Sequence, residues 1–310
     1  MFRKIFTFLI FTVFLLTACQ PISSTIEENQ STFKVIAVES FLADIAQNVA
    51  GDRLVVETLM PRGLDPHSFE PTPKDVAKIS DSDILIVNGA GFEEWLEDIL
   101  ENLPADQIFI EASAGLQSRT IEEGHSEDDG HDHEIDPHFW LDPNLVITYV
   151  ENIRDGFIKL DPDGKEIYTA NAADYIEELK ELDEYIETKV SEIPAERRLI
   201  VTNHESFGYF ADRYGFEVVG TIIHSVSSGS TPSAQQMAEL VDQMRETGAT
   251  AIFMETGSNA ELAEQLSQET GIKVVYDLYT HSVSGADGNA PSYIALMKYN
   301  VDQMVRALTD

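Results

Sequence analysis

Four histidines in this sequence stand where metal-binding side chains are expected. His67 lies in GLDPHSFEP, His138 in DPHFWLDP, His204 in VTNHE and His281 in LYTHS. Neutral imidazole is the commonest metal ligand in proteins. Four nitrogen ligands suit tetrahedral Zn²⁺ better than Mg²⁺, Ca²⁺ or Mn²⁺, which prefer oxygen. If the fold brings these residues together, they form an all-nitrogen metal site, whereas each one alone could be an ordinary loop or capping residue.

A second group of histidines lies just before His138. Residues 122–134 are acidic, contain glycine and carry His125, His131 and His133. Such a segment buries little, so we expect a mobile loop that captures metal in an auxiliary role. The alternative interpretation is a solvated acidic linker with incidental histidines. From residue 136 onward Pro, Phe, Trp and Leu can pack, which places His138 on ordered backbone before a helix that begins at Asp142-Pro143.

The elements that must position these residues alternate between strand and helix. Each half of the chain contains four βα-type units, a pattern typical of a parallel sheet covered on both faces. We therefore predict an α/β fold with two Rossmann-like lobes, each built on a four-stranded parallel sheet. The expected strands are 33–38, 54–60, 84–88, 107–110, 198–202, 217–222, 250–255 and 272–276, and the expected helices are 40–51, 73–80, 93–100, 145–160, 206–214, 233–247, 259–270 and 293–308.

All four candidate ligands follow predicted strands, two in each half. Open parallel sheets place their ligand sites at the carboxyl ends of strands. If the two sheets face one another, the four imidazoles meet in the cleft between the lobes. His224 also ends a strand, but Ser and Gly surround it, and we interpret it as structural or incidental.

A long helix is predicted to connect the halves. From residue 165 to 193 apolar residues recur every three to four positions without a strong breaker. Its length would be roughly 40 Å, enough to cross a small domain. We interpret it as a rigid connector, with a surface helix on one lobe as the alternative. The predicted organisation is a signal peptide at 1–19, a flexible tether at 20–32, an N-terminal lobe at 33–162, a linking helix at 163–193 and a C-terminal lobe at 194–310.

The N-terminus has the features of an export signal. Arg3 and Lys4 precede an apolar stretch too short for a comfortable membrane span, and LTAC ends at Cys19. This ending resembles a bacterial lipoprotein signal, which implies lipidation of Cys19 and a membrane-anchored, extracytoplasmic protein. A single-pass anchor is the alternative. Cys19 is the only cysteine, so disulfides and cysteine metal ligands are excluded from the mature domain.

The charge excludes one class of partner. The chain has 20 Lys and Arg against 55 Asp and Glu. Removal of residues 1–19 takes away two basic residues, which leaves 18 − 55 = −37. A chain this acidic repels phosphate, so nucleic acid is not a partner. Its surface collects cations instead.

Five phrases, in order, resemble the zinc/manganese class of ABC-transporter substrate-binding proteins, also called cluster A-I. The resemblance covers about residues 33–308. It implies two lobes joined by a long helix, metal between them, a membrane permease with its ATPase as partners, and no enzymatic activity. We also expect a monomer. The phrases are residues 63–73 (GLDPHSFEPTP), 88–95 (NGAGFEEW), 136–143 (DPHFWLDP), 202–210 (TNHESFGYF) and 291–300 (PSYIALMKYN).

The resemblance also implies a ligand set. His67, His138 and His204 match its first three ligand positions, and the third is typically Glu in manganese binders and His in zinc binders. The fourth is commonly Asp, where this chain has His281. Either His281 ligates, or water completes a three-histidine site. Zn²⁺ is the expected ligand, and Mn²⁺ or another divalent metal is the alternative.

Two other function classes are weighed against transport. A zinc hydrolase could use His204 as ligand and Glu205 as base, but position 208 is Gly where a zincin helix needs a second His. Neither a Gly-x-Ser-x-Gly elbow nor a phosphate-binding loop is present. A metal-sequestering adhesin is a further alternative that sequence does not separate from transport. For release, a rigid connector favours small lobe shifts or movement of a single ligand loop, and protonation of the ligands is a second possible trigger.

Overall fold

The computed structural model describes residues 33–119, 135–226 and 231–309. The predicted signal peptide, the tether, Cys19 and the loop residues His125, His131 and His133 lie outside these residues. Among the described helices, none combines the length and apolar character that crossing a membrane requires.

The N-terminal lobe contains a four-stranded parallel sheet in the order β2-β1-β3-β4. The central strands β1 and β3 read VIA and ILIV and are fully buried, as expected for a sheet covered on both faces. The elements are β1 (Val35–Ala37), α1 (Ser40–Ala50), β2 (Val56–Thr58), η1 (Pro66–Ser68), α2 (Pro73–Ser80), β3 (Ile84–Val87), η2 (Glu94–Leu96), α3 (Glu97–Leu100), β4 (Ile108–Glu111), η3 (Phe139–Leu141) and α4 (Pro143–Leu160).

The C-terminal lobe repeats this design, with strand order β6-β5-β7-β8, also parallel. Because neighbouring strands are parallel in both sheets, the four strands of each sheet end at the same edge, and the loops that follow them lie there. Between the two sheets the chain forms η4 (Pro162–Gly164) and the long helix α5 (Lys165–Val190). The elements of the C-terminal lobe are η5 (Ala195–Arg197), β5 (Leu199–Thr202), α6 (Gly208–Tyr214), β6 (Glu217–Thr221), α7 (Ala234–Thr247), β7 (Ala251–Glu255), α8 (Glu261–Thr270), β8 (Lys273–Leu278) and α9 (Tyr293–Thr309).

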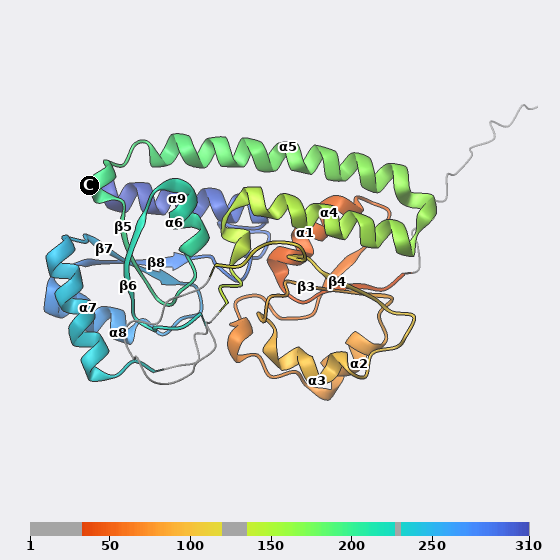
Figure 1. Cartoon of the computed structure of the whole chain (residues 1–310), viewed down its shortest axis with the longest axis horizontal. Coiled ribbons are helices and arrows are strands. Elements are labelled where there is room, and N and C mark those ends of the chain that lie inside the picture. Colours follow the sequence, from red (N-terminus) through yellow and green to blue (C-terminus); the bar gives the residue numbers. More distant parts are fainter. Residues whose placement is uncertain (1–32, 120–134, 227–230, 310) are drawn as a thin grey trace, which may run out of the picture.

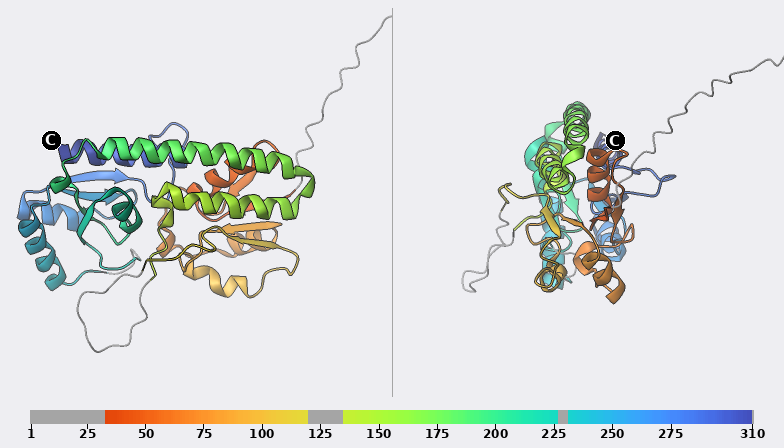
Figure 2. Two further views of the ribbon diagram at one scale, coloured as in Figure 1. Left: turned by 45° about the horizontal axis from the view of Figure 1, so that its top comes forward. Right: turned by 90° about the vertical axis from the view of Figure 1, so that its right-hand side faces the viewer.

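Helix α5 runs along both lobes, with α9 beside it over the C-terminal lobe (Figures 1 and 2). Its 26 residues span about 39 Å. One hydrophobic core follows this helix and contains residues of both sheets, including Ile84 and Phe253. Two smaller clusters lie within the separate lobes. The predicted connector is therefore confirmed as a helix that packs continuously against both halves.

Local details differ from the sequence expectations at element ends. Helix α1 begins at Ser40 as expected but ends at Ala50, and Glu39 occupies the N-cap position without a capping side-chain bond. The helix expected from residue 93 begins as the 3-10 segment η2. Strand β8 extends past its expected end at residue 276, because a register shift and a positive φ at Asp277 carry the strand on to Leu278.

A buried carboxylate fixes α5 to the C-terminal lobe. Asp183 on α5 accepts hydrogen bonds from Arg213 Nε (3.1 Å) and from the Tyr214 hydroxyl (2.8 Å), both on α6. Arg213 Nη2 also lies 2.9 Å from Glu187 Oε1, on the exposed side of α5. Removing one partner of a buried polar network leaves the others unpaired, so Asp183 has the larger structural role.

Replacing Asp183 with Ala is expected to lower the free energy of unfolding by about 2–3 kcal/mol, because Arg213 and Tyr214 lose their shared acceptor. Glu187→Ala is the control on the same helix, with an expected loss within about 0.5 kcal/mol since that pair is exposed. Urea unfolding followed by circular dichroism measures both. Equal effects of the two substitutions would contradict the assignment.

Candidate metal centre

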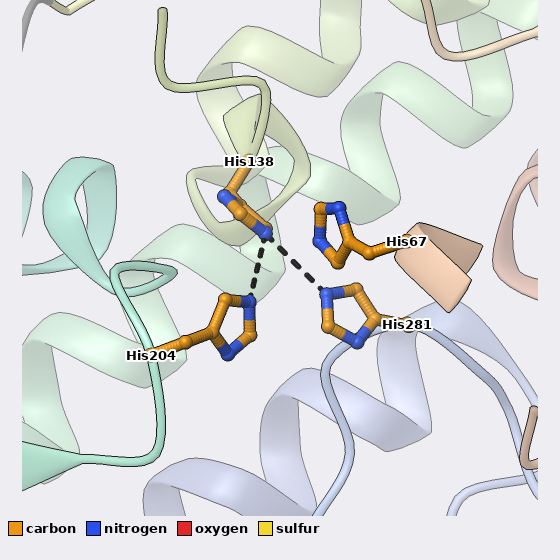
Figure 3. Close-up of side chains that lie close together, drawn as sticks. All are labelled: His67, His138, His204 and His281. Atoms are coloured by element: carbon orange, nitrogen blue, oxygen red, sulfur yellow. Dashed lines mark hydrogen bonds between the residues drawn. The ribbon is translucent and has the colours of Figure 1, made fainter. Parts of the chain in front are cut away.

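The structure brings together the four histidines that the sequence singles out. One ring nitrogen from each of His67, His138, His204 and His281 lies within 4.8 Å of the other three. Nε2 of His138 is 3.3 Å from Nε2 of His204 and 3.3 Å from Nε2 of His281. Figure 3 shows the four rings turned toward a common centre. Nε2 of His67 is buried without a hydrogen-bond partner.

Each histidine reaches this centre from the carboxyl side of a strand. His67 follows β2 and lies in η1, where Asp65 caps the turn by accepting from the His67 backbone N–H (3.0 Å). His138 caps η3, after β4. His204 comes two residues after β5, and His281 three residues after β8. Two rings thus come from each lobe, as the sequence pattern predicts.

Two buried carboxylates stand behind the rings. Asp136 Oδ1 lies 3.0 Å from Nδ1 of His138. Glu255 Oε1 lies 2.7 Å from Nδ1 of His204, an electrostatic contact without the angle of a good hydrogen bond, and its Oε2 lies 3.6 Å from Nδ1 of His281. A carboxylate at Nδ1 favours the tautomer whose Nε2 lone pair is available to a metal. Three of the four rings are therefore oriented as ligands.

Aromatic side chains pack against the four imidazole rings and shield one side of the centre from water. Phe92 packs edge-on against His67 with ring centroids 5.0 Å apart and also contacts His138 and His281. Trp140 lies 5.1 Å from His138 and stacks on Phe41. Excluding water from one side strengthens electrostatic interactions between the rings and a bound cation.

The segment that carries His138 is held from the C-terminal lobe. The Tyr209 hydroxyl donates to the Asp136 carbonyl (2.8 Å), and the Tyr293 hydroxyl donates to the Trp140 carbonyl (2.6 Å). Trp140 Nε1 donates to the Thr280 carbonyl (2.7 Å), next to His281. These bonds cross between the lobes, so the position of His138 depends on both.

The environment keeps most of the rings neutral. Burial, followed by the charge of His204, lowers the pKa of His67 to about 4 and that of His138 well below its usual value. Burial also lowers the pKa of His281. His204 differs: burial acts to lower its pKa, but the contact with Glu255 and the charges of Asp65 and Asp136 together raise it. Burial acts to raise the pKa of Glu255, but His204, the charge of His281 and the hydrogen bond from Thr280 together lower it to about 2.

Other candidate residues lie apart from this centre. His224 is exposed and is not one of the four converging histidines, in agreement with an incidental role. Glu205, the base of the hydrolase alternative, accepts a hydrogen bond from Thr221 Oγ1 (3.1 Å) and does not belong to the group. Within the described residues these four histidines are the one set of His, Cys, Asp or Glu placed to hold a metal ion.

Sequence reasoning missed the two supporting carboxylates and a further acidic pair. Glu255 ends β7, and Asp136 stands two residues before His138, so charged residues at strand ends were the available signal. The pair is Glu39 and Glu93, both buried. Glu93 accepts from the Asn88 and Gly89 backbone N–H groups (2.6 and 3.1 Å) and so holds the loop that carries Phe92.

Comparison with known proteins places this architecture among the divalent-metal-binding components of ABC uptake systems. Residues 35–307 match the family described as zinc-uptake complex component A, periplasmic (ZnuA). The chain belongs to this family, whose members are substrate-binding proteins and not enzymes.

Relatives in this family differ in the metal that their names give. The chain is 37% identical to the manganese-binding lipoprotein MntA of Halalkalibacterium halodurans, over 98% of each chain. It is 33% identical to the iron-binding protein YfeA of Yersinia pestis, over 96% of this chain and 94% of YfeA. The periplasmic zinc-binding protein TroA of Treponema pallidum superposes with a TM-score of 0.82 at 27% identity, over 90% of this chain and 100% of TroA.

Glu39→Gln tests the buried acidic pair through the pH dependence of stability. Burial and then Glu93 raise the pKa of Glu39 well above its usual value, and burial raises the pKa of Glu93 to about 7. Carboxyls with raised pKa values contribute stability at low pH that is lost as pH rises through the folded pKa. The contribution of this pair to the wild-type free energy of unfolding, measured in chelator as the difference from Glu39→Gln, should fall between pH 5 and 8, while the buried histidines affect both proteins alike.

In Glu39→Gln a neutral amide can donate to Glu93, so the difference between the two proteins should fall by an amount on the order of 2 kcal/mol. Urea unfolding at each pH provides the measurement. Glu94→Gln, an exposed neighbour, is the control and should follow the wild type. Parallel curves for wild type and Glu39→Gln would show that the pair does not hold a shared proton.

Proposed function

We propose that this protein captures Zn²⁺ outside the cytoplasmic membrane and delivers it to an ABC permease powered by an ATPase. His67, His138, His204 and His281 are the proposed ligands. The observation that carries the proposal is the convergence of four imidazole nitrogens between the lobes, with two of the nitrogen–nitrogen distances at 3.3 Å.

The spacing of these nitrogens suits zinc. Ligands of Zn²⁺ lie at about 2.0–2.1 Å in a tetrahedron, which sets neighbouring nitrogens about 3.3–3.4 Å apart. Both distances from His138 Nε2, to His204 and to His281, have this value. Nitrogen lone pairs that face each other at this distance repel unless a cation or a proton lies between them. All four nitrogens lie within 4.8 Å of one another, so inward movements of about 1 Å or less would complete the tetrahedron.

The charge of the site suits a divalent ion. Four neutral imidazoles supply no charge, while Asp136 and Glu255 supply two negative charges directly behind them. An ion of charge +2 therefore meets two buried carboxylates that offset its charge, although Asp136 is also paired with the partly exposed Arg119 (3.4 Å). This balance does not distinguish among divalent metals.

Manganese, or another divalent metal, is the second candidate. Relatives that cover nearly the whole chain are named for manganese and iron, which favours this candidate over zinc. The donor set opposes it, because Mn²⁺ prefers oxygen ligands and all four converging groups are nitrogen. Cu²⁺ binds most histidine sites tightly in vitro, so affinity alone does not identify the physiological metal.

The remaining assignments complete the proposal. Cys19 is the lipidation site of an extracytoplasmic lipoprotein, and His125, His131 and His133 form an auxiliary capture loop. The lobes extend over 33–162 and 194–310, with the linking helix between them. We propose a transport role over adhesion or sequestration, because the family is that of an uptake complex.

Competitive titration with Zn²⁺ and Mn²⁺, read by tryptophan fluorescence to which Trp140 beside His138 contributes, tests the metal and the fourth ligand together. One Zn²⁺ should bind without displacement by Mn²⁺. His281→Ala should weaken Zn²⁺ binding by at least about tenfold, while His224→Ala, the matched control outside the centre, should leave it unchanged. Displacement of Zn²⁺ by Mn²⁺ would establish the second candidate. Unchanged affinity in His281→Ala would mean a three-histidine site.

Metal binding should release at least one proton per ion near pH 6. His204 loses its proton, and Asp136 behind His138 adds a further fraction, because burial raises the pKa of Asp136 to about 6. The pKa is lowered in His67, His138 and His281 but raised in His204, so His204 is the ring that carries a proton before metal binds. Imidazole ligates only when neutral, and affinity should therefore fall as pH drops through the raised pKa of His204. Calorimetry in two buffers of different ionisation enthalpy counts the protons. Release of none, or equal affinity at pH 5 and 7.5, would refute the proton trigger.

A further inference from the structure

The four rings are not equally accessible from solvent. His138 and His204 are completely buried, whereas His281 is 9% exposed and His67 is partly exposed. His67 and His281 are therefore the two rings nearest to solvent, and they mark the side of the centre from which an ion can approach. These two residues come from different lobes, so the accessible side of the centre lies at the boundary between the lobes.

A narrow crevice reaches this side. Residues 63–65 of the N-terminal lobe form one wall, and residues 255–258 with His281 and Ser282 of the C-terminal lobe form the other. Its volume is about 10 Å³, room for about one water molecule. Farther out the crevice adjoins a cleft of about 360 Å³, and both are lined by Asp65, Gly257 and Ser258. The shared residues place the two cavities side by side, and together they define the course toward His281, which lines the crevice.

The walls of the crevice meet through backbone and small side chains. The Gly63 N–H donates to Ser282 Oγ (2.9 Å), and Ser282 Oγ lies 3.0 Å from Ser40 Oγ. Gly257 has φ +85°, and a Cβ at this position would lie 2.8 Å from the Gly63 carbonyl oxygen. A single side-chain-to-backbone hydrogen bond thus closes the crevice at Gly63, and few apolar contacts need to be lost when it widens.

The charges along this course attract cations. Asp65 lines both cavities, and Glu255 lines the inner one. Asp65 belongs to the same loop as His67 and accepts a hydrogen bond from its backbone N–H (3.0 Å). A cation held at Asp65 is therefore next to the loop that carries the first ligand, while the chain as a whole, with a formal charge of −35, concentrates cations near its surface.

We propose that the divalent ion enters and leaves through the crevice between residues 63–65 and 255–258, with Asp65 as the carboxylate that receives the hydrated ion before it passes to His281. This inference rests on the proposed function, because it concerns the route to the same metal centre. It assigns to Asp65, Gly257 and Ser258 a role in how fast the metal ion enters and leaves the centre. None of the three residues is a ligand of the bound ion in this proposal.

A reversible block of the crevice tests the route. Cys19 is the only cysteine, so a chain with Cys19→Ser and Ser258→Cys has one thiol. Attachment of a bulky methanethiosulfonate label at that thiol should slow Zn²⁺ association and chelator-induced dissociation together, by at least tenfold, with the dissociation constant unchanged. A residue on the route changes both rates in proportion, whereas a ligand changes the equilibrium. Reduction of the label should restore both rates in the same sample.

The matched control is Ser191→Cys with the same label, at the exposed C-terminal end of α5. Its exchange rates should equal those of the unlabelled protein. Unchanged rates in labelled Ser258→Cys would overturn the route, as would a changed dissociation constant with unchanged association. If the unlabelled chain binds neither Zn²⁺ nor Mn²⁺, the proposed function fails instead.

Asp65→Asn tests the receiving carboxylate. The association rate should fall several-fold at low ionic strength, and its dependence on salt should weaken, because one attractive charge is lost from the route. Asp98→Asn, at an exposed position on α3, is the control. Equal association rates and salt dependence in the two variants would remove Asp65 from the route.

Discussion

The architecture depends on holding a double positive charge in a place that water scarcely reaches. Uncompensated charge is costly there, and neutral imidazoles do not supply compensation. Asp136 and Glu255 supply it from behind the rings, at Nδ1 of His138, His204 and His281. This requirement explains why buried acids occur at the carboxyl end of β7 and two residues before His138. The same acids select the tautomers that turn Nε2 toward the centre.

The scaffold limits how the centre can change. Helix α5 packs along both lobes, and Asp183 fixes it to α6. The segment that carries His138 receives hydrogen bonds from Tyr209 and Tyr293 of the C-terminal lobe. A wide rotation of the lobes would break the two tyrosine hydrogen bonds and the packing of α5 against one of the lobes. Movement is cheaper at the loop of His67, which a hydrogen bond from Gly63 to Ser282 ties to the other lobe. Small displacements of this loop are sufficient to add or remove a ligand.

Much of this arrangement could be predicted because it follows from chain direction. Strand and helix alternate with a clear period, and parallel strands deliver their following residues to one edge, so the convergence of the four histidines was accessible from sequence. The roles of Asp136 and Glu255 were not, because an acidic residue after a strand looks the same whether it faces solvent or a ring. Glu39 illustrates the same limit, since its burial beside Glu93 depends on packing between segments more than 50 residues apart. The metal preference depends on distances of a few tenths of an ångström and is not encoded in residue type alone.

The hydrophobic core continues without a break from the N-terminal sheet, under α5, to the C-terminal sheet. Proteins built from two separate cores can lose one half while the other stays folded, but a shared core couples the halves into one cooperative unit. Neither half can therefore be expected to present its two histidines alone. Ion binding at the boundary and folding of the whole chain become linked equilibria, so occupancy of the centre should be visible as a shift of a single unfolding transition.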